Sequence, residues 1–319
     1  MVPSSVINVA VDSIMIPKLI TIVGPTAIGK TALSISLAKH YGCEIISADS
    51  RQFYKEMNIG TAVPSPEELK SAKHHFIQHK SINETYSVGD FERDAIEKIK
   101  ELHKRTTTVI MIGGSGLYIK AVTDGLDDFP SIDKDVRIDL NRRLKNEGLK
   151  SLQDELFTVD RKAYESIAID NPHRVIRALE VYQGTGRPYS SFLSQPKKKR
   201  DFDTIYIGLR ADRQVIYDRI NKRVDLMMKA GLLDEVKSLY PFKDVNALNT
   251  VGYKELFRYL DGEIDLEFAI SEIKKNTRRF AKRQLTWFTK NKDIEWFSHD
   301  CDFGDIISYI DSMHKKSLT

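Results

Sequence analysis

Cysteine is scarce in this sequence: the 319 residues include only Cys43 and Cys301, which lie far apart. This scarcity argues against a disulfide framework or a cysteine-based zinc module, and it predicts a reducing compartment. No apolar run approaches the length of a transmembrane helix. Residues 1–17 contain no Lys or Arg and no long apolar stretch, which argues against a secretory signal or a membrane anchor. We therefore expect a cytoplasmic protein that does not associate with membranes.

The composition is that of a soluble globular protein, with 41% hydrophobic and 29% charged residues. The chain is long enough for about two domains and a sizeable core. Its net charge of +4 is small, so the distribution of charge is more informative than the total. No internal repeat or low-complexity tract is present.

A glycine-rich segment near the N-terminus has the phosphate-binding spacing G-x-x-x-x-G-K-[ST]. The apolar, β-branched run before it, residues 18–23, predicts a buried strand, and residues 32–39 after it predict a helix. Backbone N–H groups of such a turn point at one anion near the positive end of the helix. The lysine adds a charge for the outer phosphate, and the threonine hydroxyl suits Mg²⁺. An ordinary glycine turn is the alternative. The segment consists of Gly24, Pro25, Thr26, Ala27, Ile28, Gly29, Lys30 and Thr31.

Polar residues follow the second predicted strand, residues 44–47. Asp49 and Ser50 come directly after it. Because ligands bind at the carboxyl ends of strands in a parallel α/β sheet, both residues are expected at the same edge as the phosphate loop. A turn or helix-capping role for Asp49 fits this stretch equally well.

The third predicted strand, residues 108–112, ends in the glycine-rich sequence Gly113-Gly114-Ser115-Gly116. A P-loop ATPase usually carries an Asp at this point for Mg²⁺ and water. Its absence argues against a plain ATPase. The paired glycines allow either a tight turn or the close approach of a substrate, with Ser115 donating a hydrogen bond.

The alternation of strands and helices stops between residues 123 and 200 and resumes with a strand at 204–209. Pro172 after Asn171 is typical of a helix start, and Gly184 with Gly186 of a helix stop. A basic linker, residues 195–200, closes this region. Four helices are predicted here, at residues 133–146, 151–157, 162–168 and 172–182.

We therefore predict an α/β fold with a P-loop NTPase-like core, a parallel sheet and an all-helical insertion domain. Residues 1–17 form a loose extension, and residues 18–122 form the first part of the core. The insertion spans residues 123–200. Residues 201–319 complete the core and end in a basic helix. A further helix is predicted at residues 91–105, and His74 with His75 is placed in loop-rich sequence without a third metal ligand.

Two predicted helices carry notable basic residues. Arg219 and Arg223 are four residues apart on one helix and share a face, where they are either solvated or clamp a phosphate. The last long helix, residues 265–288, has no acidic residue after Glu272. Its basic face is either solvated or an RNA backbone footprint, and the one-sided charge favours RNA. The predicted buried stripe consists of Leu266, Ile270, Ile273, Phe280 and Phe288, and Trp287 is also predicted to be core. The basic face consists of Lys274, Lys275, Arg278, Arg279, Lys282 and Arg283.

Five motifs in order resemble the tRNA dimethylallyltransferases, also called tRNA isopentenyltransferases. They are GPTAIGKT, ISADSRQFY with NIGTA, GGSGLYIKA, DNPHRVIRALEVY with TGRPYS, and RRFAKRQLTWF. The resemblance runs from about residue 19 to residue 288, nearly the whole chain. The Cys/His zinc finger of many eukaryotic members is missing, so the chain resembles the bacterial type.

The resemblance implies transfer of a dimethylallyl group from dimethylallyl diphosphate to N6 of an adenosine. This adenosine lies just 3′ of the anticodon in tRNAs that read codons beginning with U. The implied partners are the tRNA anticodon stem-loop and dimethylallyl diphosphate, the implied cofactor is Mg²⁺ near Thr31, and we expect a monomer. The implied fold carries a helical domain that grips the stem-loop.

Individual roles also follow from the resemblance. The phosphate loop, with Lys30, holds the diphosphate, Arg223 binds it as well, and Asp49 is the general base. Histidine replaces glutamine at position 173, and Ser115 stands where the family commonly has threonine. The implied tRNA contacts are Asp49, Ser50, Arg51, Gln52, Ser115, Arg137, His173, Arg174, Arg177, Gly252, Tyr253, Thr277, Arg278, Arg279, Lys282, Arg283 and Gln284.

Two other functions use the same features. A small-molecule kinase would use ATP at the phosphate loop, with the helical insertion as its lid. An RNA-binding protein would use the loop as a switch without changing the RNA. The basic final helix and the sequence DSRQFY argue against the kinase.

Overall fold

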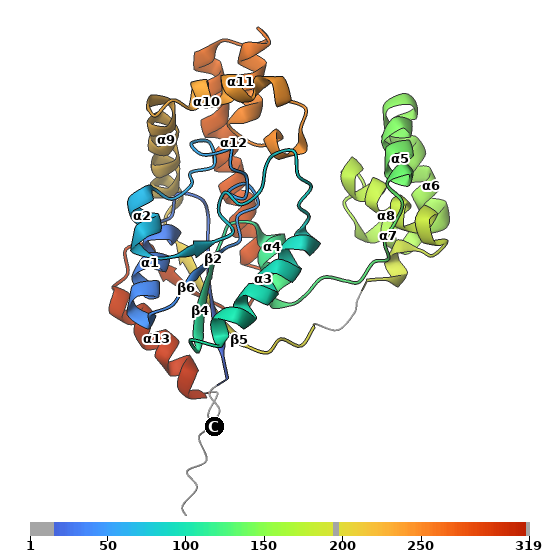
Figure 1. Cartoon of the computed structure of the whole chain (residues 1–319). Coiled ribbons are helices and arrows are strands. Elements are labelled where there is room, and N and C mark those ends of the chain that lie inside the picture. The colour runs from blue at the N-terminus through green and yellow to red at the C-terminus, as the bar shows by residue number, and fades with distance from the viewer. Residues whose placement is uncertain (1–15, 194–197, 317–319) are drawn as a thin grey trace, which may run out of the picture. The chain divides into compact units, whose positions relative to one another are not determined.

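The computed structural model describes residues 16–193 and 198–316. Within these residues the strands form one parallel sheet of six, in the order β3-β2-β4-β1-β5-β6 (Figure 1). The predicted parallel α/β core is therefore confirmed. The strands are β1 (Lys18–Val23), β2 (Ile45–Ser47), β3 (His74–His75), β4 (Thr108–Ile112), β5 (Asp203–Arg210) and β6 (Ile294–Ser298).

Helices follow most of the strands, and several helices in succession, without an intervening strand, lie between β4 and β5. The helices before the insertion are α1 (Lys30–Tyr41), α2 (Pro66–Ser71), α3 (Val88–His103) and α4 (Gly116–Thr123). Those of the insertion are α5 (Lys134–Glu147), α6 (Leu149–Val159), α7 (Arg161–Ser166) and α8 (Pro172–Thr185). Those after it are α9 (Arg213–Lys229), α10 (Leu232–Leu239), α11 (Tyr253–Leu260), α12 (Leu266–Phe288) and α13 (Phe303–Lys316). Short 3-10 turns lie at Tyr189–Ser191, Tyr240–Phe242 and Asn246–Leu248.

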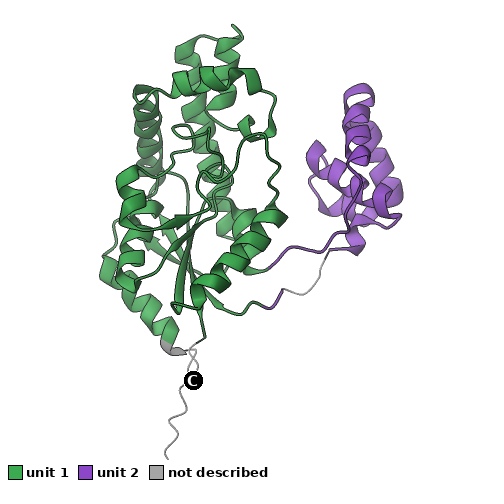
Figure 2. Cartoon of the chain, in the orientation of Figure 1, with its two compact units in different colours: residues 1–124, 200–319 green, residues 125–199 purple. Residues whose placement is uncertain are grey.

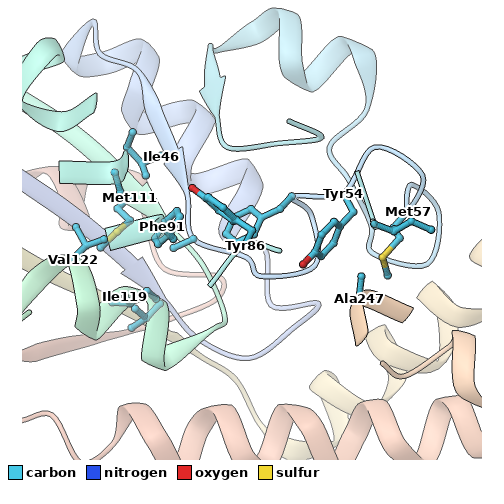
Figure 3. Packing of buried hydrophobic residues seen from close by; sticks show 14 of the residues in the cluster. Ile46, Tyr54, Met57, Tyr86, Phe91, Met111, Ile119, Val122 and Ala247 are labelled. Atoms are coloured by element: carbon cyan, nitrogen blue, oxygen red, sulfur yellow. The ribbon is translucent and has the colours of Figure 1, made fainter. Parts of the chain in front are cut away.

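The central strands are buried along their whole length because helices cover both faces of the sheet. One face packs against apolar residues of α1 and α13, such as Leu37 and Ile310. The other packs against α3, α4 and α12, where Phe91 and Ile119 lie near Met111 of β4 (Figure 3). The strand ends that carry the glycine-rich motifs are thus held by packing from both sides.

The chain divides into two compact units, Met1–Asp124 with Arg200–Thr319 and Gly125–Lys199 (Figure 2). The sequence analysis places the insertion at residues 123–200. The smaller unit has its own core of apolar residues from α5, α6, α7 and α8. Helix α8 ends at Thr185 with Gly186 as its left-handed C-cap, so the predicted stop is confirmed at Gly186. Gly184 lies in the last turn, where a Cβ atom would lie 2.5 Å from Ile132.

Some predicted boundaries differ from the structure. Helix α3 begins at Val88, three residues before the predicted start, because Ser87 and Asp90 form a capping box. His74 and His75 were expected in a loop but form β3, which pairs with β2. No strand was predicted at β6 and no helix at α13. Of the predicted extension, residues 1–15 lie outside the described residues, as do residues 194–197 of the linker. No helix in the described ranges is long and apolar enough to span a bilayer.

Candidate active site

The phosphate loop turns sharply between β1 and α1. Gly24 has a φ of +145°, and a Cβ atom there would lie 2.7 Å from the carbonyl oxygen of Leu209 on β5. Gly29 caps α1 with a φ of 110°, and Ala27 has a positive φ of 65°. The backbone N–H groups at the start of α1 have no partners within the helix, so they are available to an anion. The local geometry is that expected of the motif.

Lys30 points back into this loop. Its Nζ atom donates hydrogen bonds to the carbonyl oxygens of Gly24 at 3.0 Å and Pro25 at 2.8 Å. Burial lowers the pKa of Lys30 to about 8, against an opposing effect of Asp49, and Arg223 lowers it further. An anion bound in the loop would restore the ammonium form.

Two arginines of α9 contact the same loop. Arg219 donates from Nη1 to the carbonyl oxygen of Ile28 at 3.1 Å, and Arg223 donates from Nη1 to Oγ1 of Thr26 at 3.4 Å. Burial lowers the pKa of Arg223, although Glu68 and Asp49 oppose the shift. Arg223 is half-buried against the loop, which favours the phosphate clamp for this residue, whereas Arg219 is exposed to solvent.

The carboxyl ends of β2 and β4 meet beside the loop. The Ser115 hydroxyl accepts a hydrogen bond from the Ser50 backbone N–H at 3.2 Å, and the two hydroxyls are also 3.2 Å apart. Asp49 accepts a hydrogen bond from the N–H of Arg51 at 3.0 Å. Gly113 permits this approach, because a Cβ atom there would lie 2.5 Å from the carbonyl oxygen of Ala48. The second and third motifs are thus in direct contact at the ends of β2 and β4.

Gln284 of α12 contacts both the phosphate loop and the loop after β4 from the interior of the protein. Its side chain is 6% exposed, its Oε1 atom accepts from the N–H of Thr26 at 2.8 Å, and its Nε2 atom donates to the carbonyl oxygen of Gly114 at 3.0 Å. The resemblance implied a tRNA contact here, but a buried amide with both ends occupied is not available to RNA in this conformation. The same holds for Tyr253, which is fully buried.

Two residues of the DSRQ stretch are also engaged within the protein. Arg51 donates to the carbonyl oxygens of Asn246 and Ala247, at 3.3 and 2.9 Å. Gln52 donates to the carbonyl oxygens of Thr61 and Ala62, at 3.2 and 2.9 Å. Both side chains therefore fix neighbouring loops, whereas Asp49 and Ser50 lie at the strand ends.

Glu235, which was not predicted from the sequence, holds the NIGTA segment to the start of α11. The Glu235 carboxylate on α10 accepts from the backbone N–H groups of Asn58, Ile59 and Gly60, at 3.1, 2.7 and 3.0 Å. It also accepts from the Tyr253 hydroxyl at 2.7 Å, and burial, with this carboxylate, raises the pKa of Tyr253. Glu235 lies in an amphipathic helix with a charged exposed side, so no local sequence signal distinguishes it.

The basic residues of α12 lie in two groups. One group faces other side chains of the core unit: Lys274 pairs with Asp225 at 2.6 Å, Lys275 pairs with Glu272, and Arg278 donates to Asn221 at 2.7 Å. The other group is exposed and, in the part of the chain that the structure describes, forms no ion pair. It consists of Arg279, Lys282 and Arg283.

Two aromatic residues of α12 were wrongly predicted to be core. Phe280 is 39% exposed and Trp287 is 42% exposed. Both lie at the margin of the buried stripe, on the side of Arg283, whose guanidinium lies 5.7 Å from the Phe280 ring centre. Ile273 and Phe288 of the predicted stripe are buried as expected, and Ala269, Ala281 and Gln284 complete the buried face. Close to the glycine-rich loop, the buried position 284 carries a hydrogen-bonded amide, because a Cβ atom at Gly114 would lie 2.1 Å from Nε2 of Gln284.

In the smaller unit, the predicted tRNA contacts lie on α5 and α8. His173 and Arg174 are exposed. Arg137 and Arg177 both pair with Glu180, at 3.2 and 2.8 Å, and the Glu180 side chain is only 8% exposed. The buried carboxylate thus orients two arginines that remain partly open to solvent.

Comparison with known proteins gives a consistent result. A model of the IPP transferase family matches residues 52–291. The tRNA dimethylallyltransferase of Christiangramia forsetii is 61% identical over 294 residues, which cover 92% of this chain and 97% of the relative. That of Flavobacterium johnsoniae is 57% identical over 306 residues, covering 94% and 99%.

Solved structures are similar over most of the chain. A full-length tRNA isopentenylpyrophosphate transferase from Bacillus halodurans is 42% identical, with a TM-score of 0.68 and coverage of 95% of this chain and 97% of the other. A eukaryotic dimethylallyltransferase acting on tRNA is 28% identical, with a TM-score of 0.76 and coverage of 89% and 74%.

Proposed function

The chain belongs to the tRNA dimethylallyltransferases, a family of prenyltransferases, and we propose that it modifies the adenosine on the 3′ side of the anticodon. In this proposal it transfers the dimethylallyl group of dimethylallyl diphosphate to N6 of that adenosine, in tRNAs that read codons beginning with U. The observation that supports the proposal is the phosphate loop, where Lys30 donates to the carbonyl oxygens of Gly24 and Pro25 and Arg223 contacts Thr26. Asp49 lies just after β2 of the same parallel sheet.

The phosphate loop supports the donor half of the reaction. The N–H groups at the start of α1 and the cations Lys30 and Arg223 bind the diphosphate. As the C–O bond to the diphosphate breaks, its electron pair leaves with the diphosphate, and these groups stabilise the negative charge that develops. Lys30 is well suited to this role, because the bound anion replaces the loop carbonyls as the partner of its ammonium group.

Asp49 supports the acceptor half. The exocyclic amine of adenine is a weak nucleophile because its lone pair is delocalised into the ring. As the N–C bond forms, the nitrogen must lose a proton, and a carboxylate within hydrogen-bond reach accepts it. The base must leave its stack so that its N6 amine can reach the carboxylate. The Ser50 and Ser115 hydroxyls, which contact each other, are placed to orient the flipped base.

The phosphate loop could hold Mg²⁺ with a single protein ligand, Thr31. The described part of the chain contains no group of three or more His, Cys, Asp or Glu side chains that could hold a metal by themselves. Mg²⁺ commonly takes few protein ligands and completes its shell with substrate phosphates and water. Thr31, at the start of α1, is the residue that would hold it. Bound there with the diphosphate, the ion would supply positive charge for the leaving group.

The anticodon stem-loop is the proposed RNA partner. The exposed group Arg279, Lys282 and Arg283 on α12, and His173 with Arg174 on α8, provide cations for the phosphate backbone. Backbone contacts of this kind set affinity, whereas contacts to unpaired bases set specificity.

The direct test uses an unmodified tRNA with a UNN-reading anticodon and an A-A-A stretch in its loop. The tRNA is incubated with the protein, Mg²⁺ and dimethylallyl diphosphate, without ATP, and analysed by mass spectrometry. We expect a gain of one C5H8 unit on the adenosine 3′ of the anticodon. Bound tRNA of unchanged mass would contradict the proposal, and a phosphorylated product formed only with ATP would favour a kinase.

A further inference from the structure

Gln284 joins two catalytic loops that lie far apart in the sequence. The N–H of Thr26 needs an acceptor and the carbonyl oxygen of Gly114 needs a donor, and one amide side chain supplies both, at 2.8 and 3.0 Å. Only one orientation of the amide satisfies both partners, with Oε1 toward Thr26 and Nε2 toward Gly114. The side chain thus acts as a fixed spacer between the phosphate loop and the Gly113–Gly116 loop.

The amide of Gln284 is closely packed against Gly114. A Cβ atom at Gly114 would lie 2.1 Å from Nε2 of Gln284, so the glycine makes room for the amide. One helical turn further along α12, the Trp287 ring packs against Gly116, where a Cβ atom would lie 2.2 Å from Nε1 of the indole. Helix α12 therefore packs closely against the Gly113–Gly116 loop at two successive turns.

We propose that Gln284 is a positioning residue for the donor site and not an RNA contact. It holds the phosphate loop at Thr26, whose hydroxyl also meets Arg223, in register with the loop that carries Ser115. The inference rests on the proposed function in that the phosphate loop binds the diphosphate of the donor. In this proposal the two sides of α12 have different roles. The exposed cations face outward, and Gln284 on the inner side sets the geometry of the reacting groups.

Substitutions at Gln284 distinguish this role from RNA binding. Gln284→Met keeps the length of the side chain and removes both hydrogen bonds. Gln284→Glu keeps an acceptor for Thr26 but places a carboxylate oxygen against the Gly114 carbonyl. We expect the KM for dimethylallyl diphosphate to rise about tenfold in Gln284→Met, with a fall in kcat and a change of less than about twofold in the Kd for tRNA.

Two control variants complete the set. Gln214→Met changes an exposed glutamine on α9 whose amide contacts Asp218, and it should leave all parameters unchanged. Lys282→Gln removes an exposed cation of α12, and it should weaken tRNA binding in a salt-dependent way while leaving the donor KM unchanged.

Hydrogen exchange measures the contact without turnover. In the wild-type protein the Thr26 amide is hydrogen-bonded to Gln284, so it should exchange slowly, and Gln284→Met should accelerate exchange in a peptide covering residues 24–29. Unchanged exchange and donor KM, together with weaker tRNA binding, would overturn the inference. If the wild-type protein fails to transfer C5H8 to tRNA, the proposed function fails, whereas the exchange result still reports on the Gln284 contact itself.

A second pair of variants keeps the inference testable if Gln284→Met fails to fold. Gly114→Ala places a methyl group where Nε2 of Gln284 lies, so it should reproduce the donor defect of Gln284→Met. In Gly114→Ala/Gln284→Ala the shortened side chain makes room for the methyl group, and the double variant should be no worse than Gln284→Ala alone. Fully additive losses would show that the two positions act independently and would overturn the inference.

Discussion

The Tyr253 hydroxyl donates a hydrogen bond of 2.7 Å to the Glu235 carboxylate, which also accepts from the backbone of residues 58–60. Close packing accompanies this bond, because a Cβ atom at Gly60 would lie 2.5 Å from the Tyr253 ring. The NIGTA loop, α10 and the start of α11 are thus held by one carboxylate. Tyr253 begins the helix that follows the Asn249–Gly252 turn, so this contact fixes a segment implied in RNA binding.

Replacing Glu235 should therefore destabilise the protein. Glu235→Ala leaves three backbone N–H groups and a buried hydroxyl without their acceptor, and we expect a loss of about 3 kcal/mol in the free energy of unfolding. Tyr253→Phe removes a single hydrogen bond and should cost about 1 kcal/mol. Chemical denaturation measures both. Asp234→Ala, on the exposed side of α10, is the control and should change stability by less than about 0.5 kcal/mol. Equal losses for Glu235→Ala and Asp234→Ala would contradict this account.

Donor binding should take up protons near pH 8. Burial lowers the pKa of Lys30 to about 8 in the free protein, and a bound diphosphate favours the ammonium form. The free protein therefore loses this proton as the pH rises through about 8, and its affinity for the donor falls over the same range. Calorimetry at pH 8 in buffers of different ionisation enthalpy measures the uptake. Lys30→Met corrects for titration of the diphosphate, and an uptake equal to that of the wild-type protein would contradict the assignment.

Acid should destabilise the region around His79. Both ring nitrogens of His79 are buried without a hydrogen-bond partner among the described residues, and the ring packs against Phe53, Phe76 and Tyr86. Burial, helped by Lys80, lowers the pKa of His79 to about 4. Between pH 6.5 and 4 the unfolded chain binds the proton more readily, so stability is present above about 6.5 and falls as the pH drops toward 4.

The test compares wild-type protein with His79→Phe across this range. His74 and His103 also have pKa values lowered by burial, so both proteins should lose stability in acid. The His79→Phe variant should lose less stability, because it lacks one of the buried imidazoles. Parallel stability curves from pH 7 to pH 4 would mean that His79 does not contribute.

RNA binding should change the fluorescence of Trp287. Its indole is 42% exposed on the side of α12 that carries Arg283, and the only other tryptophan, Trp296, packs partly buried against the core. Base stacking or a change of polarity at α12 should quench Trp287. Trp296→Phe should keep the quenching on addition of tRNA, and Trp287→Phe should lose it. Quenching that persists in Trp287→Phe would place the RNA elsewhere.

Much of the core was predictable because its signals are local. The phosphate loop follows a fixed spacing, and the buried parallel strands are continuous apolar runs, so sequence alone places β1, β2, β4 and β5. The helices of the smaller unit follow from periodicity and from the Asn171–Pro172 start. Asp49 and Ser50 were expected at the edge of the phosphate loop because ligands bind at the carboxyl ends of parallel strands.

The remaining features depend on contacts between distant segments. Periodicity gives the direction of the buried stripe of α12 but not its margins, so Phe280 and Trp287 were assigned to the core. The resemblance implied a tRNA contact at Gln284, which is buried. Polar residues that bond to backbone groups inside the protein resemble surface residues in a sequence. Glu235 and Gln284 are both of this kind, and their partners lie 175 and 258 residues away along the chain.

The central claim is that Asp49 accepts the proton from the adenine amine beside a phosphate loop that holds the leaving group. The most direct measurement is the single-turnover rate of dimethylallyl transfer by Asp49→Ala, with tRNA and donor both saturating, together with its Kd for tRNA. We predict that the rate falls by roughly 10²- to 10⁴-fold while the Kd for tRNA stays nearly unchanged. A rate close to that of the wild-type protein would contradict the account.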